Sequence, residues 1–283
     1  MPTSIRRMAG VLSALAALSQ LAPVRAQDPG LTAFGRQLGS HLHAHIESAP
    51  LAILPLGAIE YHGPSGPPLT DSLIAEGLAS GLASALKASR FPVVSYTHCP
   101  AHTASFRGSI SVRPEVITLL LTDVIGGILD NGFEKVLILN AHNGNVGPAQ
   151  AALSRVAAER PKSQLLLVNW WETLPSSEVD RLGLFTSGNG GHGHGGPLEL
   201  SVAAHFAPRT VRAGEGPDLP TLQPQASFPY YLEKSDRARW PGYSGKLSEI
   251  AADKGRRLAG MAEQRILDLV RAWLADDGKP GSW

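Results

Sequence analysis

Four polar side chains in the first half of the sequence have the types and spacing found in hydrolytic metal centres. Glu60 and His62 are two residues apart, so in an extended segment their side chains point the same way. Asp71 follows a loop rich in glycine and proline, and His142 lies in a loop of asparagine and glycine. Carboxylates and imidazoles are the ligands of zinc and manganese hydrolases, and several of each suit two metals that share an activated water.

Each of these residues also has an ordinary structural explanation. Asp71 could cap a helix, Glu60 and His62 could form an ion pair within their loop, and His142 could hydrogen-bond its own loop. The metal interpretation therefore depends on whether the fold brings the four together.

Apolar runs alternate with segments of helical spacing along the chain. We expect strands over residues 51–56, 91–96, 136–139 and 165–169, and helices over 71–90, 114–131, 148–160, 196–206 and 246–275. This alternation, with short loops, predicts a three-layer α/β/α domain around a mainly parallel sheet.

Polar or aromatic residues follow three of the expected strands. Glu60 and His62 come after the first, His142 comes after 136–139, and Trp170 and Trp171 come after 165–169. Ligands of parallel sheets bind outside the carboxyl ends of the strands, so these residues are expected to meet in one crevice.

The first 26 residues have the features of a signal peptide. Arg6 and Arg7 precede an apolar stretch over 8–22, and 24–26 (VRA) permits cleavage before Gln27. The stretch is too short and interrupted for stable membrane insertion. We predict export to the periplasm or beyond, by the Sec route or a twin-arginine route, and one domain over 27–283; an ordinary N-terminal helix is the alternative.

Composition excludes several classes of protein. The 283 residues are 43% hydrophobic and 17% charged, which excludes a disordered chain and a coiled coil. The first 26 residues hold three arginines and no acid, so the rest carries 22 basic and 24 acidic residues. With no basic patch, nucleic-acid binding is not expected. Cys99 is the only cysteine, so there is no internal disulfide, and a buried packing role is favoured.

Several segments together resemble the creatininase family. Residues 54–64 (LPLGAIEYHGP) with Asp71, 133–145 (FEKVLILNAHNGN) and 194–201 (HGGPLELS) resemble its three motifs in order and spacing. Residues 106–111 and 252–256 resemble further parts of the family pattern, so the resemblance runs from about residue 51 to the last helix. It implies a creatininase-like fold, hydrolysis of a C–N bond in a small amide, lactam or formamide, and a homo-oligomer, often a hexamer.

The resemblance also implies roles for individual residues. Glu60 and His142 would bind one metal, His62 would bind the other, and Asp71 would bridge the two. Two divalent ions per chain are implied, with Zn2+ favoured over Mn2+. His194 matches the catalytic histidine, which moves a proton between water and the leaving nitrogen.

Some positions depart from the family pattern. Gly144 stands where creatininase has a glutamate ligand, and Glu199 is the nearest candidate to replace it. In the expected substrate pocket Trp171 matches a family aromatic, although a core position would also explain it. Asn143 and Ser65 stand in place of an aromatic and a histidine, which predicts a wider or more polar pocket than a creatinine site.

A second hypothesis is an exported protein that keeps the fold and binds a metal or small ligand without catalysis. Gly144 is its main support. The presence of His194 argues against it, because a binding module needs no proton carrier. The irregular stretch over 208–242 is long for a compact domain and could serve an interface.

Overall fold

The computed structural model describes residues 32–49, 51–184, 193–219 and 240–275. The predicted signal peptide and most of the irregular stretch over 208–242 lie outside these ranges. Export, the oligomeric state and the limits of the domain therefore stay predictions. Across the described ranges, no helix combines the length and apolar character that crossing a membrane requires.

Four parallel strands form the sheet, in the order β2-β1-β3-β4. They are β1 (Leu51–Leu56), β2 (Ser89–Arg90), β3 (Lys135–Asn140) and β4 (Gln164–Asn169). Every residue of β1 is buried, as are all but the first of β3. Strands covered on both faces need apolar side chains on both, which explains the continuous apolar runs LAILPL and VLIL.

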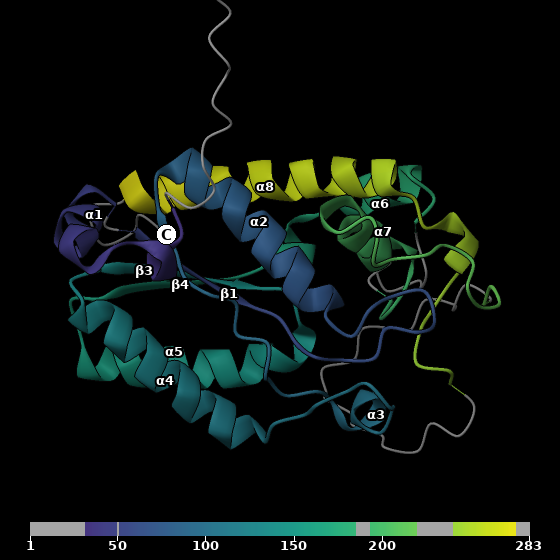
Figure 1. Cartoon of the computed structure of the whole chain (residues 1–283), viewed down its shortest axis with the longest axis horizontal. Coiled ribbons are helices and arrows are strands. Elements are labelled where there is room, and N and C mark those ends of the chain that lie inside the picture. Colours follow the sequence, from purple (N-terminus) through teal and green to yellow (C-terminus); the bar gives the residue numbers. More distant parts are fainter. Residues whose placement is uncertain (1–31, 50, 185–192, 220–239, 276–283) are drawn as a thin grey trace, which may run out of the picture.

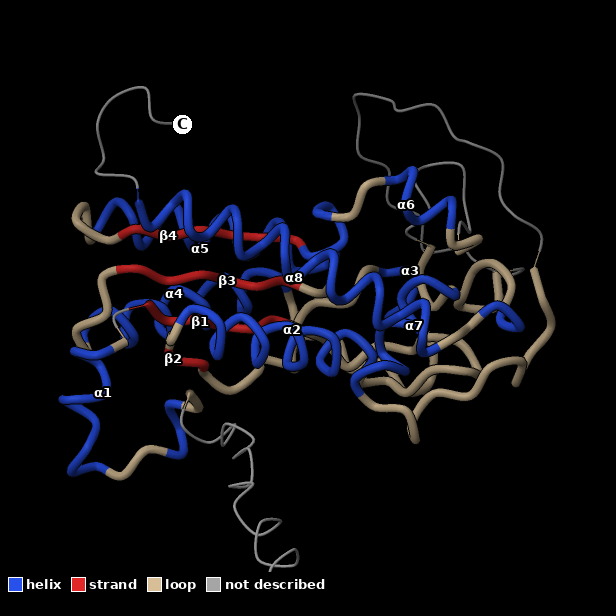
Figure 2. Tube along the Cα trace, turned by 90° about the horizontal axis from the view of Figure 1, so that it is seen from above, coloured by secondary structure: helices blue, strands red, loops and turns tan. Residues whose placement is uncertain are grey.

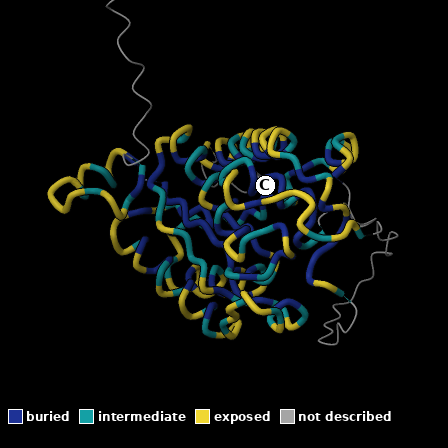
Figure 3. The backbone as a smooth tube through the Cα atoms, turned by 45° about the vertical axis from the view of Figure 1, so that its right-hand side comes forward, coloured by how far each residue is buried: buried dark blue, intermediate teal, exposed yellow. Residues whose placement is uncertain are grey.

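Helices cover both faces of the sheet (Figure 1), which confirms the three-layer fold. On one face lie α2 (Thr70–Leu86), α7 (Pro197–Phe206) and α8 (Ala252–Ala275), whose apolar sides form one core cluster with the sheet. On the other lie α4 (Pro114–Asp130) and α5 (Val146–Glu159), in a second cluster. Figure 3 shows the buried strands between helices whose outer turns are exposed. Shorter elements are α1 (Leu42–Ser48), α3 (Ala101–Ala104), α6 (Ser176–Arg181), η1 (Phe34–Arg36), η2 (Gly39–His41), η3 (Asn143–Asn145), η4 (Trp170–Thr173) and η5 (Leu247–Glu249).

Three expected elements differ from the structure. The strand expected over 91–96 is wrong, because the edge strand β2 is Ser89–Arg90 and only Val94 forms an isolated bridge beyond it. The preceding helix ends early, at Leu86, since Lys87 has the left-handed φ of 52°. The last helix begins at Ala252 rather than 246, because a short 3-10 turn and an extended Ile250 come first.

The three long strands end side by side. Leu56 pairs with Asn140, and Asn140 pairs with Asn169, so the loops that follow start from one edge of the sheet (Figure 2). Side-chain amides tie these loops together. Asn140 Nδ2 donates to Asn169 Oδ1 at 2.9 Å, and Asn145 Nδ2 donates to the Gly57 carbonyl at 3.0 Å.

The close packing of α8 on α7 gives a test of the fold. A Cβ built at Gly255 would lie 1.8 Å from the Ser201 carbonyl oxygen, and backbone cannot rotate away. We expect Gly255→Ala to lower the free energy of unfolding by about 1–3 kcal/mol or more, measured by urea denaturation. Gly260→Ala is the matched control on the same helix, with nothing within 4 Å, and should be neutral or stabilising by about 0.5–1 kcal/mol. Equal effects of the two changes would contradict this packing.

Candidate metal centre

Five potential ligands meet at the carboxyl edge of the sheet. Glu60 and His62 come from the loop after β1, and His142 from the loop after β3. Asp71 lies in the first turn of α2 and Glu199 in the first turn of α7. The first four are buried, and 18% of the Glu199 side chain is exposed. The structure thus brings together the five residues expected to bind metal.

Asp71 lies between two imidazole rings. Its Oδ1 is 3.1 Å from His62 Nε2, and its Oδ2 is 2.9 Å from His142 Nδ1. The Oδ2 atom is buried and makes no hydrogen bond of good geometry. Leu69, not Asp71, is the N-cap of α2, so capping does not explain the aspartate. A carboxylate with each oxygen directed at a different imidazole has the arrangement of a bridging ligand.

Backbone carbonyls fix the orientation of both rings. His62 Nδ1 lies 2.8 Å from the Glu60 carbonyl oxygen, and His142 Nε2 lies 2.8 Å from that of His98. A carbonyl only accepts, so these nitrogens carry the hydrogen. In a neutral ring the other nitrogen is then a lone pair that faces carboxylate oxygens. Acceptors facing acceptors require a proton or a cation between them, and this arrangement is typical of metal-bound histidine.

Protons satisfy these groups when no metal is bound. Burial lowers the pKa of His62, but the charges of Asp71 and Glu199 outweigh it, so the pKa is raised well above 6.5. The pKa of His142 is raised in the same way by Glu60 and Asp71. Burial opposes ionisation of Glu60, yet His142 and His194 lower its pKa to about 2. Protons and metal ions therefore compete for the same positions.

Position 144 lacks the glutamate ligand of creatininase, and Glu199 is the candidate to replace it. Glu199 Oε2 lies 3.5 Å from His62 Nε2 and accepts the Gly195 N–H at 2.8 Å. At Gly144 a Cβ would lie 2.2 Å from the His98 carbonyl oxygen, so no side chain fits there. Among the described residues, His62, Asp71 and Glu199 form one group whose ligand atoms lie within 4.8 Å of one another. His62 therefore has a second carboxylate neighbour in Glu199, although position 144 offers no side chain.

His194 lies at the edge of this cluster. Its Nε2 is 2.6 Å from the Tyr61 carbonyl oxygen, so the hydrogen is on Nε2. Its Nδ1 faces Glu60 Oε2 at 3.5 Å, and 20% of the side chain is exposed. Cys99 is buried nearby, and burial, with the charges of Glu60 and Asp71, raises its thiol pKa to about 12. A neutral thiol is a poor nucleophile, so His194 is the better candidate for chemistry.

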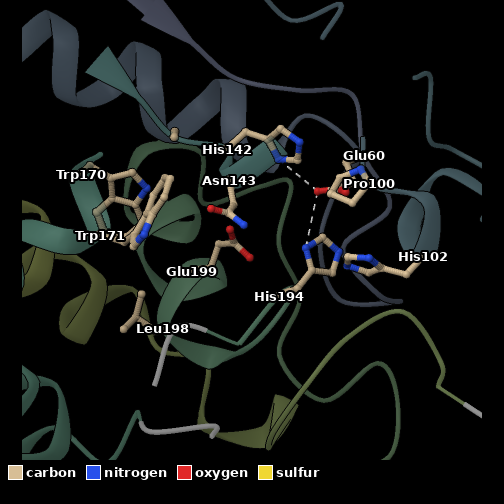
Figure 4. A pocket seen from close by; sticks show the side chains of 11 residues that line it. Glu60, Pro100, His102, His142, Asn143, Trp170, Trp171, His194, Leu198 and Glu199 are labelled. Carbon is tan, nitrogen blue, oxygen red and sulfur yellow. Dashed lines mark ion pairs between the residues drawn. The ribbon is translucent and has the colours of Figure 1, made fainter. Parts of the chain in front are cut away.

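A cavity of about 310 Å³ opens beside the cluster. Figure 4 shows Trp170, Trp171 and Leu198 on one side of it, with His194 and His102 on the other. Asn143 also lines the cavity, as expected from the sequence.

Other residues are placed differently from what the sequence suggested. Ser65 is not among the lining residues; it is buried, and its Oγ accepts the Glu215 N–H at 3.3 Å. Trp170 directly follows β4 and lines the cavity beside Trp171, as its position after a strand predicts. Sequence reasoning missed Pro100 and His102, which lie well beyond the edge strand β2 and carry no periodic signal.

Comparisons with known proteins identify the family of this chain. The family model for creatininase, described as creatinine amidohydrolase, matches residues 39–270. A mycofactocin precursor peptide peptidase of Mycobacterium tuberculosis (strain CDC 1551 / Oshkosh) is 28% identical over 260 residues, which cover 86% of this chain and 94% of that protein.

Solved structures share the fold. A crystal structure of creatinine amidohydrolase superposes with a TM-score of 0.78 at 20% identity, over 87% of this chain and 98% of the other. Two further creatininase structures of similar match are described as a Zn-Zn type and as a Mn form. Because the family model covers most of the sequence, from η2 to α8, the chain belongs to the creatininase family.

Proposed function

We propose that this protein is an amidohydrolase that holds two divalent metal ions and hydrolyses a C–N bond of a small amide. The observation that carries the proposal is Asp71, with one oxygen toward His62 and the other toward His142. Mixed carboxylate and imidazole donors suit Zn2+ and Mn2+, and related creatininases are described with each. Zn2+ is the favoured ion.

The donors divide into two sets that share Asp71. Glu60 and His142 would hold the first ion, and His62 and Glu199 the second. Bound divalent ions would polarise the substrate carbonyl and lower the pKa of a water toward roughly 7. Asp71 Oδ2, which makes no hydrogen bond, and the imidazole lone pairs of His62 and His142 fit such ions.

His194 is the residue proposed to move protons. The Tyr61 carbonyl holds the hydrogen on Nε2, which leaves Nδ1 free to accept a proton from the attacking water. The same nitrogen can then donate that proton to the leaving nitrogen. Trp171 and Leu198 exclude water from the opposite wall, and the Asn143 amide can orient a polar substrate group.

The cavity suits a lactam, a formamide or another small amide, and about 310 Å³ is at the lower end of ordinary ligand pockets. A peptide amide is the second candidate, because a peptide peptidase matches this chain along most of its length. The non-catalytic hypothesis rests on the missing side chain at Gly144, and the Glu199 carboxylate, 3.5 Å from His62 Nε2, argues against it.

Substitution of His194 tests the proton-transfer role. We expect His194→Ala to reduce hydrolysis by about 10²–10⁴-fold while two metals stay bound, because proton transfer is lost and the ligands remain. Amine release from a panel of lactams, formamides and short peptides, followed by mass spectrometry, measures this. The control is His43→Ala, at a side chain 90% exposed on α1, which should keep full activity. Full activity without His194 would exclude its role.

Metal content tests the ligand sets directly. Elemental mass spectrometry of the zinc-loaded protein should find two ions per chain, and Glu199→Gln should reduce this to one, because the amide is a weaker ligand. Glu263→Gln is the control; Glu263 is a partly buried carboxylate on α8 and should leave two ions bound. One ion or none in the unaltered protein would contradict the dinuclear proposal.

Thermal stability should depend on pH in opposite ways with and without metal. In the metal-free protein the raised pKa values of His62 and His142 stabilise the fold fully below pH 6.5, and this contribution is lost as pH rises through the raised values. Zinc needs the neutral rings, so its stabilisation should grow as pH rises. The melting temperature, measured between about pH 6 and 9, should therefore fall with rising pH in EDTA, and the increase that zinc adds should grow. The same dependence of melting temperature on pH with zinc and with EDTA would count against competition between protons and metal.

A further inference from the structure

One short segment contacts two of the three proposed ligands of the first metal, Glu60 and His142. Residues 98–103 supply the His98 carbonyl, 2.8 Å from His142 Nε2, and the Thr103 hydroxyl, which donates to Glu60 Oε1. Glu60 and Thr103 are each 1% exposed, so water does not compete for this hydrogen bond.

The Thr103 hydroxyl has a single hydrogen and two acceptors within reach. One is Glu60 Oε1, and the other is the Pro100 carbonyl oxygen at 3.1 Å. Hydrogen bonds to an ionised carboxylate are roughly twice as strong as neutral ones, so the hydrogen goes to Glu60. This occupies Oε1 and leaves Oε2 facing His142 Nδ1 at 3.2 Å and His194 Nδ1 at 3.5 Å.

Thr103 is itself held in place by a closed set of hydrogen bonds. Its carbonyl oxygen accepts from Ser109 Oγ at 2.9 Å, and Ser109 Oγ accepts from the Tyr61 N–H at 2.9 Å. Tyr61 directly follows Glu60, so the ring returns to the residue that the hydroxyl contacts. The position of the hydroxyl relative to the carboxylate is therefore set by backbone on both sides.

We propose that Thr103 is a positioning residue that makes Glu60 bind its metal through Oε2 alone, and that it thereby sets the affinity of the first metal position. The inference rests on the proposed function, since it assumes that Glu60 binds metal. The second position depends on other partners: His62 Nδ1 is held by the Glu60 carbonyl, and Glu199 accepts the Gly195 N–H. Loss of the Thr103 hydroxyl should thus affect one ion and spare the other.

The test is a zinc titration in competition with a chromogenic chelator, on the full chain. Thr103→Val keeps the shape and removes the hydroxyl. We expect the affinity for one of the two zinc ions to fall about 10–100-fold, as is typical when the partner of a metal ligand is removed, while the other ion binds as before. Thr103→Ser restores the hydroxyl and should restore the affinity.

Thr97→Val is the matched control. Thr97 is also 1% exposed, and its hydroxyl donates to the Gly57 carbonyl at 2.8 Å. In Thr97→Val that carbonyl still accepts a hydrogen bond from the Asn145 amide. It should lose some thermal stability and bind both zinc ions as tightly as the unaltered protein. Equal loss of zinc affinity in Thr97→Val and Thr103→Val would mean general loosening and would overturn the proposal.

The remaining outcomes are also decisive. Two ions held equally by the unaltered protein and Thr103→Val would refute the role of Thr103 alone, whereas no zinc bound by the unaltered protein would refute the metal function itself. Thr103→Ala replaces the valine variant if the latter does not fold. If neither folds while Thr97→Val does, the hydroxyl serves folding and not metal affinity, and the inference fails.

Discussion

Two buried imidazole rings, each with one nitrogen committed to a backbone carbonyl, constrain the rest of this molecule. Once His62 and His142 are oriented in this way, their other nitrogens face the carboxylates of Asp71, Glu60 and Glu199, and positive charge must lie between them. The surrounding structure keeps these groups from separating. Parallel strands that end in register bring the loops to one edge, and asparagine side chains tie the loops together.

The elements that hold the ligands could be predicted because their signals are local. The apolar run LAILPL predicts a buried strand, and a polar cluster after such a strand predicts a residue at the carboxyl edge. Glu60, His62 and His142 follow this logic. Family resemblance then directed attention to Glu199, which no local pattern would place beside His62, because it lies on a helix far along the chain.

The segment around Thr103 could not be predicted in the same way. Residues 91–104 contain a two-proline, non-periodic stretch with one short helical turn, so its course is set by tertiary contacts and not by propensity. The cavity walls show the same limit in part: Trp171 was expected there, but Leu198 and His102 come from other parts of the chain and were not. Walls built from separate loops can vary independently of one another, which fits a family whose members are described with different substrates.

The close approach of the His98 carbonyl to Gly144 has a consequence for how such sites diverge. Because a Cβ at 144 would collide with backbone, no single substitution can add a carboxylate there. The chain near residue 98 would have to move first, and that movement would release the ring of His142. The two positions are therefore coupled: while the chain near residue 98 keeps this course, position 144 is restricted to glycine, and a carboxylate there requires a second change that moves the His98 carbonyl.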